Sequence, residues 1–156
     1  MAIEVGQQAP DFTLFDSDKN EVTLSGLQGQ NVLMLFYPLA FTGTCTKEMC
    51  MVRDNISSYN DVNAKVLGIS IDNAHVQKKF KEENDINFTL LSDFNKDVIK
   101  EYDVVHETFS LGMKEVGKRA AFVLDKEGVV RYAEVLDVPS ELPNFEAINE
   151  TLKSLS

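Results

Sequence analysis

The chain of 156 residues is 44% apolar and 26% charged, values typical of one globular domain and not of a disordered chain. Its 15 basic and 25 acidic side chains give a net charge of −10, which argues against binding to nucleic acid or to an anionic membrane surface. The opening residues MAIEVGQQAP show neither the basic region nor the apolar core of a secretory signal, so we expect a cytoplasmic protein.

The first 91 residues contain the patterns of five strands. Asp11–Phe15 and Glu21–Leu24 flank a polar turn and predict a β-hairpin at the N-terminus. Asn31–Tyr37 is an almost continuous apolar run, typical of a strand that is buried on both faces, and Ala64–Ile71 repeats this pattern. Phe88–Leu91 predicts a further, shorter strand.

Helical spacing lies between these strands. Apolar positions recur on one helical face at Cys45, Met49, Val52, Ile56 and Tyr59. Two asparagines are placed to cap helices, Asn73 before Val76 and Phe80, and Asn95 before Val98, Ile99 and Tyr102. A final amphipathic helix carries Phe145, Ile148, Leu152 and Leu155.

A second hairpin is predicted near the C-terminus, where Ala120–Leu124 and Val129–Val135 flank the turn Asp125–Gly128. Strands that alternate with helices and end in an antiparallel hairpin favour the α/β class, with a central mixed β-sheet flanked by helices. No repeat or linker divides the sequence, so we expect a single domain over residues 1–156.

The segment from Tyr37 to Glu48 is the best candidate for chemistry. A buried strand ends at Pro38, a short polar loop follows, and Cys45 opens a helix. The unpaired N–H groups and the dipole of a helix start favour an anion, and the thiolate is the reactive form of cysteine. Thr42 can offer its hydroxyl to a bound oxygen ligand or to the sulfur. The alternative is that Cys45 is a buried structural cysteine.

Three separated motifs resemble those of the peroxiredoxin family. The pattern P-x-x-x-T-x-x-C, here Pro38, Thr42 and Cys45, is similar to the family's active-site signature. The opening Gly6–Leu14 resembles the family's usual start, and Arg119 matches the arginine that these enzymes bring to the site. A second cysteine five residues after the first is similar to the PrxQ (bacterioferritin-comigratory) branch. The stretch FYPLAFTGTCTKEMC also resembles the one-cysteine branch AhpE.

This resemblance implies a thioredoxin-like fold and the reduction of hydrogen peroxide and organic hydroperoxides without a metal, haem or flavin cofactor. Cys45 would attack the O–O bond and become a sulfenic acid. Thr42 and Arg119 would hold the peroxide oxygens and stabilise the leaving oxygen. Pro38 would shield the sulfur from water. Glu48 matches a position that usually orients the arginine, and its alternative is a solvated helix residue.

Cys50 would be the resolving thiol, which forms a disulfide with Cys45. On an ideal helix, Cα atoms five residues apart lie roughly 8–9 Å from each other, whereas a disulfide tolerates roughly 4.4–6.8 Å. The first turns of the helix must therefore unwind before this pair can bond; the alternative is that Cys50 only packs. Arg53 fits a second arginine of the PrxQ branch, and its alternative is a surface ion pair with Asp54.

The implied partners are a peroxide and thioredoxin or a similar dithiol reductant, and we expect a monomer or a weak homodimer. Two other functions stay open. A thioredoxin-like disulfide reductase is disfavoured because such enzymes use C-x-x-C, while four residues separate Cys45 from Cys50. A metal-carrying thioredoxin-like module would need a histidine beside the cysteines, and neither His75 nor His106 is close in sequence.

Overall fold

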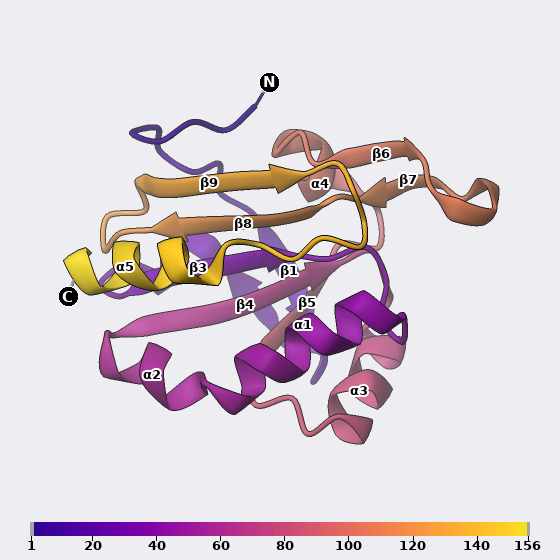
Figure 1. Ribbon diagram of the computed structural model, residues 1–156, viewed down its shortest axis with the longest axis horizontal. Helices are drawn as coiled ribbons and strands as arrows, with labels where there is room; N and C mark the ends of the chain where they lie inside the picture. Colours follow the sequence, from indigo (N-terminus) through magenta and orange to yellow (C-terminus); the bar gives the residue numbers. More distant parts are fainter. Residues whose placement is uncertain (1, 156) are drawn as a thin grey trace.

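A seven-stranded mixed sheet runs through the centre of the computed structural model, which describes residues 2–155 (Figure 1). The strand order is β2-β1-β5-β4-β3-β8-β9. The bounds of these strands are β1 (Thr13–Asp16), β2 (Glu21–Thr23), β3 (Asn31–Phe36), β4 (Ala64–Ser70), β5 (Thr89–Ser92), β8 (Arg119–Leu124) and β9 (Val130–Leu136). The neighbours β3, β4 and β5 are parallel, and all other pairings are antiparallel. The predicted mixed sheet is therefore confirmed.

The central strand β3 separates two hydrophobic cores. Leu33 and Leu35 belong to one core, while Val32, Met34 and Phe36 belong to the other. This alternation follows from the two-residue period of a strand. Every residue of β3 is buried, which confirms the prediction of a strand covered on both faces.

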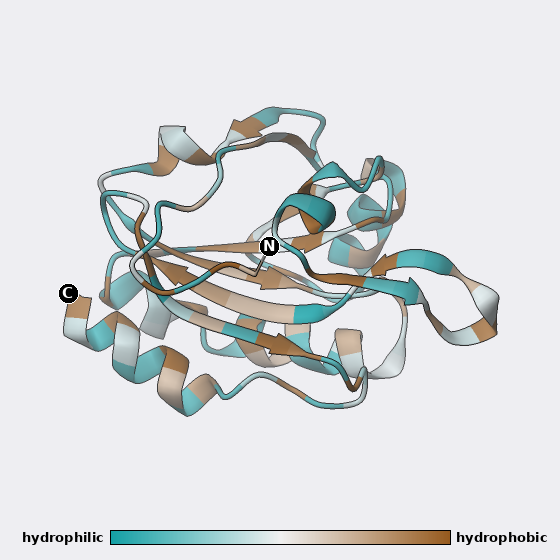
Figure 2. Cartoon of the chain, turned by 90° about the horizontal axis from the view of Figure 1, so that it is seen from above, coloured by the Kyte–Doolittle hydropathy of each residue, from teal (hydrophilic) through white to brown (hydrophobic). Residues whose placement is uncertain are grey.

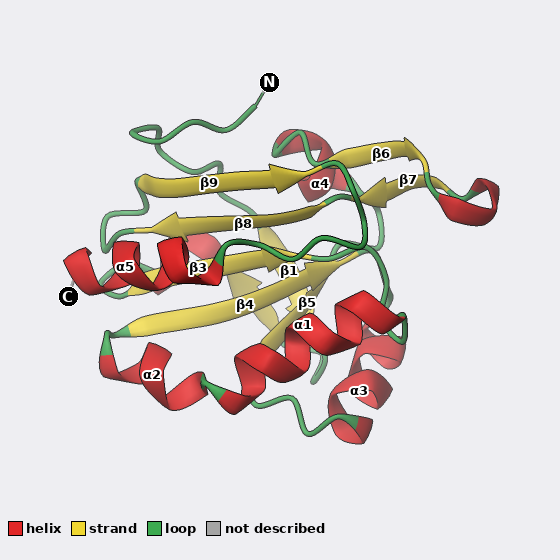
Figure 3. Ribbon diagram, viewed as in Figure 1, coloured by secondary structure: helices red, strands yellow, loops and turns green. Residues whose placement is uncertain are grey.

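Helices cover both faces of the sheet (Figure 3). Their bounds are α1 (Gly43–Asp54), α2 (Ile56–Asp61), α3 (Ala74–Glu83), α4 (Asp97–Glu101) and α5 (Phe145–Leu155). Side chains of α1, α2, α3 and α5 enter the core on the Leu33 side, and those of α4 enter the core on the Val32 side. Brown and teal residues alternate along α5 in Figure 2, as expected for the amphipathic helix predicted there.

The helix that starts near Cys45 is shorter than its apolar face suggests. The predicted apolar face is confirmed, since it buries Cys45, Met49, Val52 and Tyr59. The helix is nevertheless interrupted at Asn55, which separates α1 from α2. The Asn55 side chain donates to the carbonyl of Met51 at 2.8 Å, a local bond of the kind that competes with helix continuation.

Of the two predicted helix caps, one is confirmed and one is wrong. Asn73 Oδ1 accepts from the backbone N–H of Val76 at 2.9 Å and caps α3. Asn95 does not cap α4. The carboxylate of Asp93 does so instead, because it accepts from the backbone N–H groups of Val98 and Ile99. Asp93 can reach them because the chain turns through Lys96 in the left-handed region before the helix begins.

A second, two-stranded sheet was not predicted from the sequence. It consists of β6 (Val105–Thr108) and β7 (Lys114–Gly117), which form a hairpin that projects from the body of the molecule (Figure 1). Its four-residue strands contain charged and exposed residues and so lack the apolar pattern of a buried strand. Within residues 2–155, no helix has the length and apolar character needed to cross a membrane.

Candidate active site

The loop after β3 carries the candidate site to one edge of the sheet. Tyr37 still donates its backbone N–H to Ile69 of β4, but Pro38 has no N–H with which to continue the ladder. The chain turns away and α1 begins at Gly43, so Cys45 lies in the first turn of that helix. The free N–H groups of this turn and the helix dipole favour an anion at the sulfur.

Strand register brings Arg119 to Cys45. Ala120 of β8 lies opposite Phe36, the last residue of β3. Arg119, one residue earlier on the antiparallel strand, therefore lies beyond the end of β3, level with the loop that follows it. Its Nη2 donates to Cys45 Sγ at 3.3 Å, and both residues are 1% exposed. A buried cation thus contacts the buried sulfur.

Glu48 is a second acceptor for Arg119. It follows Cys45 by three residues on α1 and so lies on the same face of the helix. Its Oε1 accepts a hydrogen bond of 2.7 Å from Arg119 Nη1. Glu48 is fully buried and is not a solvated helix residue. Burial raises the pKa of Glu48 to about 7, while the charge of Arg119 acts in the opposite direction.

The third acceptor for Arg119 is a backbone carbonyl that the sequence did not indicate. Nη2 also donates to the carbonyl oxygen of Pro139 at 3.1 Å. Pro139 lies in the segment that joins β9 to α5. A carbonyl group is common to every residue, so no sequence signal could have identified this contact.

Asp72 holds the loop that precedes α1, and sequence reasoning missed it. Its Oδ2 accepts from the backbone N–H of Ala40 and from the hydroxyl of Ser70, both at 2.7 Å. Burial raises the pKa of the Asp72 carboxyl above its ordinary value. One signal was present: Asp72 follows the end of β4, and the C-terminal ends of neighbouring parallel strands meet at one edge.

Phe41 and Thr42 directly precede α1 and shape the loop that leads to Cys45. Phe41 has φ of 65°, a left-handed conformation that is rare for a bulky side chain. Its ring packs edge-on against Phe80 of α3, with centroids 5.2 Å apart. The Thr42 hydroxyl donates to the carbonyl of Leu39 at 2.8 Å and not to the sulfur, so it is free to accept a hydrogen bond from a ligand. Pro38 is buried.

Cys50 and Arg53 lie away from the cluster of Cys45, Glu48 and Arg119. Both cysteines are unbonded, and five residues along a helix rotate Cys50 by about 140° from Cys45. Cys50 Sγ lies 4.0 Å from Asn84 Oδ1 at the end of α3. Arg53 Nε forms an ion pair with Asp54 at 2.9 Å, which was the alternative considered for it.

No metal-binding cluster accompanies the cysteines. Among residues 2–155, no three His, Cys, Asp or Glu side chains come together in a way that could hold a metal ion. Within the described part of the chain, the metal-carrying alternative therefore has no third ligand beside the cysteines.

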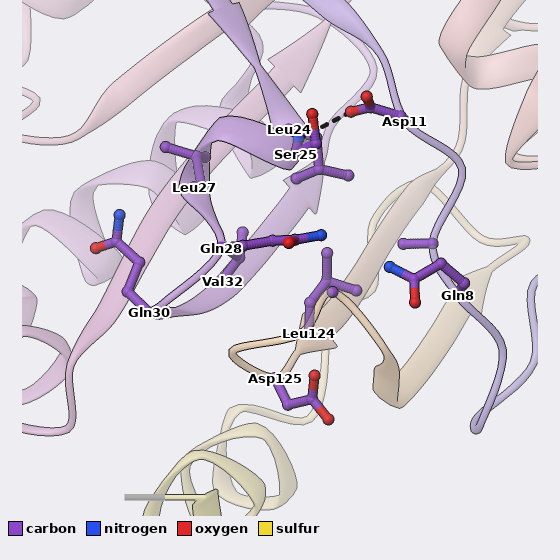
Figure 4. Close-up of a pocket in the computed structure, with 12 residues that line it drawn as sticks. Gln8, Asp11, Leu24, Ser25, Leu27, Gln28, Gln30, Val32, Leu124 and Asp125 are labelled. Carbon is purple, nitrogen blue, oxygen red and sulfur yellow. Dashed lines mark hydrogen bonds between the residues drawn. The ribbon is translucent and has the colours of Figure 1, made fainter.

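A separate cavity of about 210 Å³ lies at the other end of β3 (Figure 4). Its lining includes Val32 near the start of β3 and Leu124 at the end of β8, together with Gln8, Gln28 and Asp125. None of the residues predicted to act on a peroxide lines this cavity. Cys45 and Arg119 lie at the opposite edge of the sheet, where β3 ends.

Comparison with known sequences gives a consistent picture. A model of the AhpC/TSA family matches residues 5–133. Peroxiredoxin Bcp of Escherichia coli is 37% identical over 131 residues, which cover 83% of this chain and 84% of that protein. Chloroplastic peroxiredoxin Q of Oryza sativa subsp. japonica is 39% identical over 153 residues, 98% of this chain and 67% of that one. Alkyl hydroperoxide reductase E of Mycobacterium tuberculosis is 34% identical over 157 residues, 99% of both.

Solved structures agree with these sequence matches. The peroxidoxin BcpB from Mycobacterium tuberculosis superposes with a TM-score of 0.87 and 30% identity, over 99% of both chains. A peroxiredoxin Q structure from Xanthomonas campestris gives a TM-score of 0.83 at 25% identity, over 97% of this chain and 96% of that one. The similarity therefore extends over nearly the whole chain.

Proposed function

Because the chain belongs to the AhpC/TSA family and is a peroxiredoxin, a thiol peroxidase with a thioredoxin-like fold, we propose that its peroxidatic cysteine is Cys45. The observation that carries this assignment is the 3.3 Å hydrogen bond from Arg119 to the Cys45 sulfur. A buried thiolate requires a compensating charge, and Arg119 supplies it. Cys50, by contrast, faces the neutral amide of Asn84.

In the proposed first step, the Cys45 thiolate attacks the terminal oxygen of a hydroperoxide. The O–O bond breaks, Cys45 becomes a sulfenic acid, and the leaving alkoxide or hydroxide takes up a proton to give an alcohol or water. Arg119 and the N–H groups of the first turn of α1 stabilise the charge on the leaving oxygen. The Thr42 hydroxyl donates a hydrogen bond to the carbonyl of Leu39, so its oxygen accepts a hydrogen bond from the O–H group of the peroxide.

Two further residues support this step. Glu48 fixes the guanidinium of Arg119 through a hydrogen bond of 2.7 Å, which leaves Nη2 directed at the sulfur. Pro38 is buried at the start of the loop and limits the access of water to the thiolate. Neither residue exchanges atoms with the peroxide.

In the proposed second step, the Cys50 sulfur attacks the sulfenic sulfur of Cys45. The S–O bond breaks, an intramolecular disulfide forms, and the hydroxyl leaves as water with the proton of the Cys50 thiol. Because both residues lie on α1, their Cα atoms are roughly 8–9 Å apart while the helix is intact. The turns that carry Cys45 must therefore unwind before the disulfide forms.

A thioredoxin-type reductant returns the oxidised enzyme to its dithiol form by thiol–disulfide exchange, in which the reductant itself becomes oxidised to a disulfide. We propose thioredoxin itself as this partner and the cytoplasm as the compartment, where cysteines such as these are kept reduced. We further propose that residues 1–156 act as one peroxiredoxin domain, as a monomer or a weak homodimer. The net charge of −10 argues against nucleic acid as a partner.

Thiol chemistry on two variants tests this assignment. In Cys45→Ser, peroxide turnover should disappear because a hydroxyl is a far weaker nucleophile at neutral pH. In the matched control Cys50→Ser, one equivalent of peroxide should still produce a sulfenic acid, with no disulfide. The measurement is a mass spectrum of the oxidised protein under non-reducing conditions. Turnover by Cys45→Ser would overturn the assignment of Cys45. A stable sulfenic acid or an intermolecular dimer in the unaltered protein would overturn the role of Cys50.

A further inference from the structure

The two ends of α1 are held by different parts of the molecule. At the end that carries Cys45, the side-chain contacts of Cys45 and Glu48 both lead to Arg119 on β8. At the other end, the contacts of Cys50 and Arg53 lead to the end of α3 and the residues that follow it. These two attachments can therefore be broken separately.

The attachment at the far end consists of two hydrogen bonds that run in opposite directions. Arg53 Nη1 donates to the carbonyl oxygen of Asn84 at 2.6 Å, and Asn87 Nδ2 donates to the carbonyl oxygen of Arg53 at 3.2 Å. We name this pair of bonds the Arg53 staple. The Arg53 side chain is 28% exposed, so its bond to Asn84 is partly shielded from water, whereas the bond from Asn87 is exposed.

The residue that receives the staple is itself fixed. Asn84 is the C-cap of α3, and its side chain donates to the carbonyl of Phe80 at 3.0 Å. Cys50 Sγ lies 4.0 Å from the side-chain oxygen of the same asparagine. The staple and Cys50 are thus located at one point of contact between α1 and α3.

We propose that Arg53 is a positioning residue for α1, and that the staple confines unwinding to the turns of α1 before Cys50. This inference rests on the proposed Cys45–Cys50 disulfide. The staple keeps Cys50 and the last turn of α1 on α3 while the turns with Cys45 open. That retained turn also favours closure, because a helix extends from an existing turn more readily than it nucleates. The staple therefore favours the closed form, in which Arg119 contacts Cys45.

Three variants test the staple, and two of them remove one bond each. Arg53→Met removes the donor to Asn84, and Asn87→Ala removes the donor to Arg53. Asn87 is exposed, so its truncation should leave the core intact. The control is Arg131→Met, which breaks an ion pair with Asp125 in the C-terminal hairpin. For each protein, the rate of sulfenic acid formation and the rate of disulfide formation are measured by quenching, alkylation and mass spectrometry.

We expect the two staple variants to move these rates in opposite directions. Sulfenic acid formation should slow, because fewer molecules are closed; loss of one such hydrogen bond shifts the closed–open equilibrium by up to about tenfold. Disulfide formation should accelerate, since the same shift populates the open helix. Arg131→Met should change neither rate. A general loss of stability would instead slow both steps.

Amide hydrogen exchange on the oxidised proteins supplies the second readout. In the unaltered protein, exchange should be fast for residues 43–49 and slow for residues 51–61. In Arg53→Met, fast exchange should extend through residue 61. Unchanged rates and an unchanged exchange pattern in both staple variants would overturn the inference while leaving the proposed function intact. Failure of the unaltered protein to form the disulfide would overturn the proposed resolving step itself.

Discussion

Arg119 serves three acceptors that come from two distant parts of the chain. It donates to Cys45 and Glu48 on α1 and to the carbonyl of Pro139 after β9. The planar guanidinium presents several donors in fixed directions, which a lysine ammonium group cannot do. The resemblance predicted the proximity of Arg119 and Cys45 from sequence motifs alone. The burial of Glu48 was not predictable, because it depends on how α1 packs against β8.

The buried carboxyl of Glu48 should make stability depend on pH in an unusual direction. Burial raises the pKa of Glu48 from its ordinary 4.5 to about 7. Between these two values the folded protein binds the proton more tightly than the unfolded chain does. The free energy of unfolding contributed by this group is therefore greatest below pH 4.5 and falls as the pH rises to 7. Urea unfolding at pH 5 and at pH 7.5 measures the effect.

The variant Glu48→Gln supplies the reference for that measurement, because glutamine cannot titrate while all other groups remain. The stability of the unaltered protein relative to Glu48→Gln should decrease between pH 5 and pH 7.5. A difference that is constant across this range would show that the pKa of Glu48 is not raised.

At the scale of the elements, apolar runs identified the strands of the seven-stranded sheet better than local signals identified helix ends. Asn31–Tyr37 was predicted and β3 spans Asn31–Phe36, because six buried residues in a row leave a strong pattern. Helix ends depend on single side chains. Asn95 and Asp93 are equally good cap residues in sequence, and only the path of the chain through Lys96 decides between them.

The loop between β3 and α1 should depend on Asp72. In Asp72→Ala, the backbone N–H of Ala40 loses its acceptor, and an unsatisfied buried donor reduces stability by about 1–3 kcal/mol. The loop then no longer places α1 accurately, so the reaction with peroxide should slow roughly tenfold or more. Urea unfolding and the rate of Cys45 oxidation measure the two effects.

An exposed carboxylate in the turn between β1 and β2 provides the control for this loop variant. Asp18→Ala removes the same charge from the surface and should alter neither stability nor the oxidation rate. Equal behaviour of Asp72→Ala and Asp18→Ala would contradict the role of Asp72 in holding the loop.

At the scale of the whole molecule, a glycine in β4 leaves room for side chains that meet from two neighbouring strands and from α1. A Cβ atom at Gly68 would lie 2.8 Å from Leu90 Cδ2, 3.4 Å from Tyr37 and 3.5 Å from the sulfur of Met49. These three side chains are fully buried and have little room to move. The sequence contains Gly68 within an apolar run, but only the assembled layers show why a side chain is excluded there.

We therefore expect Gly68→Ala to lower the free energy of unfolding by about 1–3 kcal/mol, the usual effect of overpacking a core. Gly26→Ala is the matched control, since a Cβ at Gly26 meets no atom within 4 Å. Urea unfolding of both variants measures the difference. If the two alanines had the same effect, the space around Gly68 would not be as tightly filled as these contacts indicate.

The hydrogen bond between Arg119 and Cys45 joins residues that are 74 positions apart in the chain. Cys45 therefore leaves the ribosomal exit tunnel well before Arg119 has been added to the chain. Strand β3 can pair with β4 early, but its other neighbour, β8, is added late. A growing chain thus carries Cys45 before it carries Arg119, the residue proposed to stabilise its thiolate. If Arg119 acts as proposed, the enzyme acquires its chemistry only after β8 has paired with β3, so incomplete chains should not react as the finished protein does.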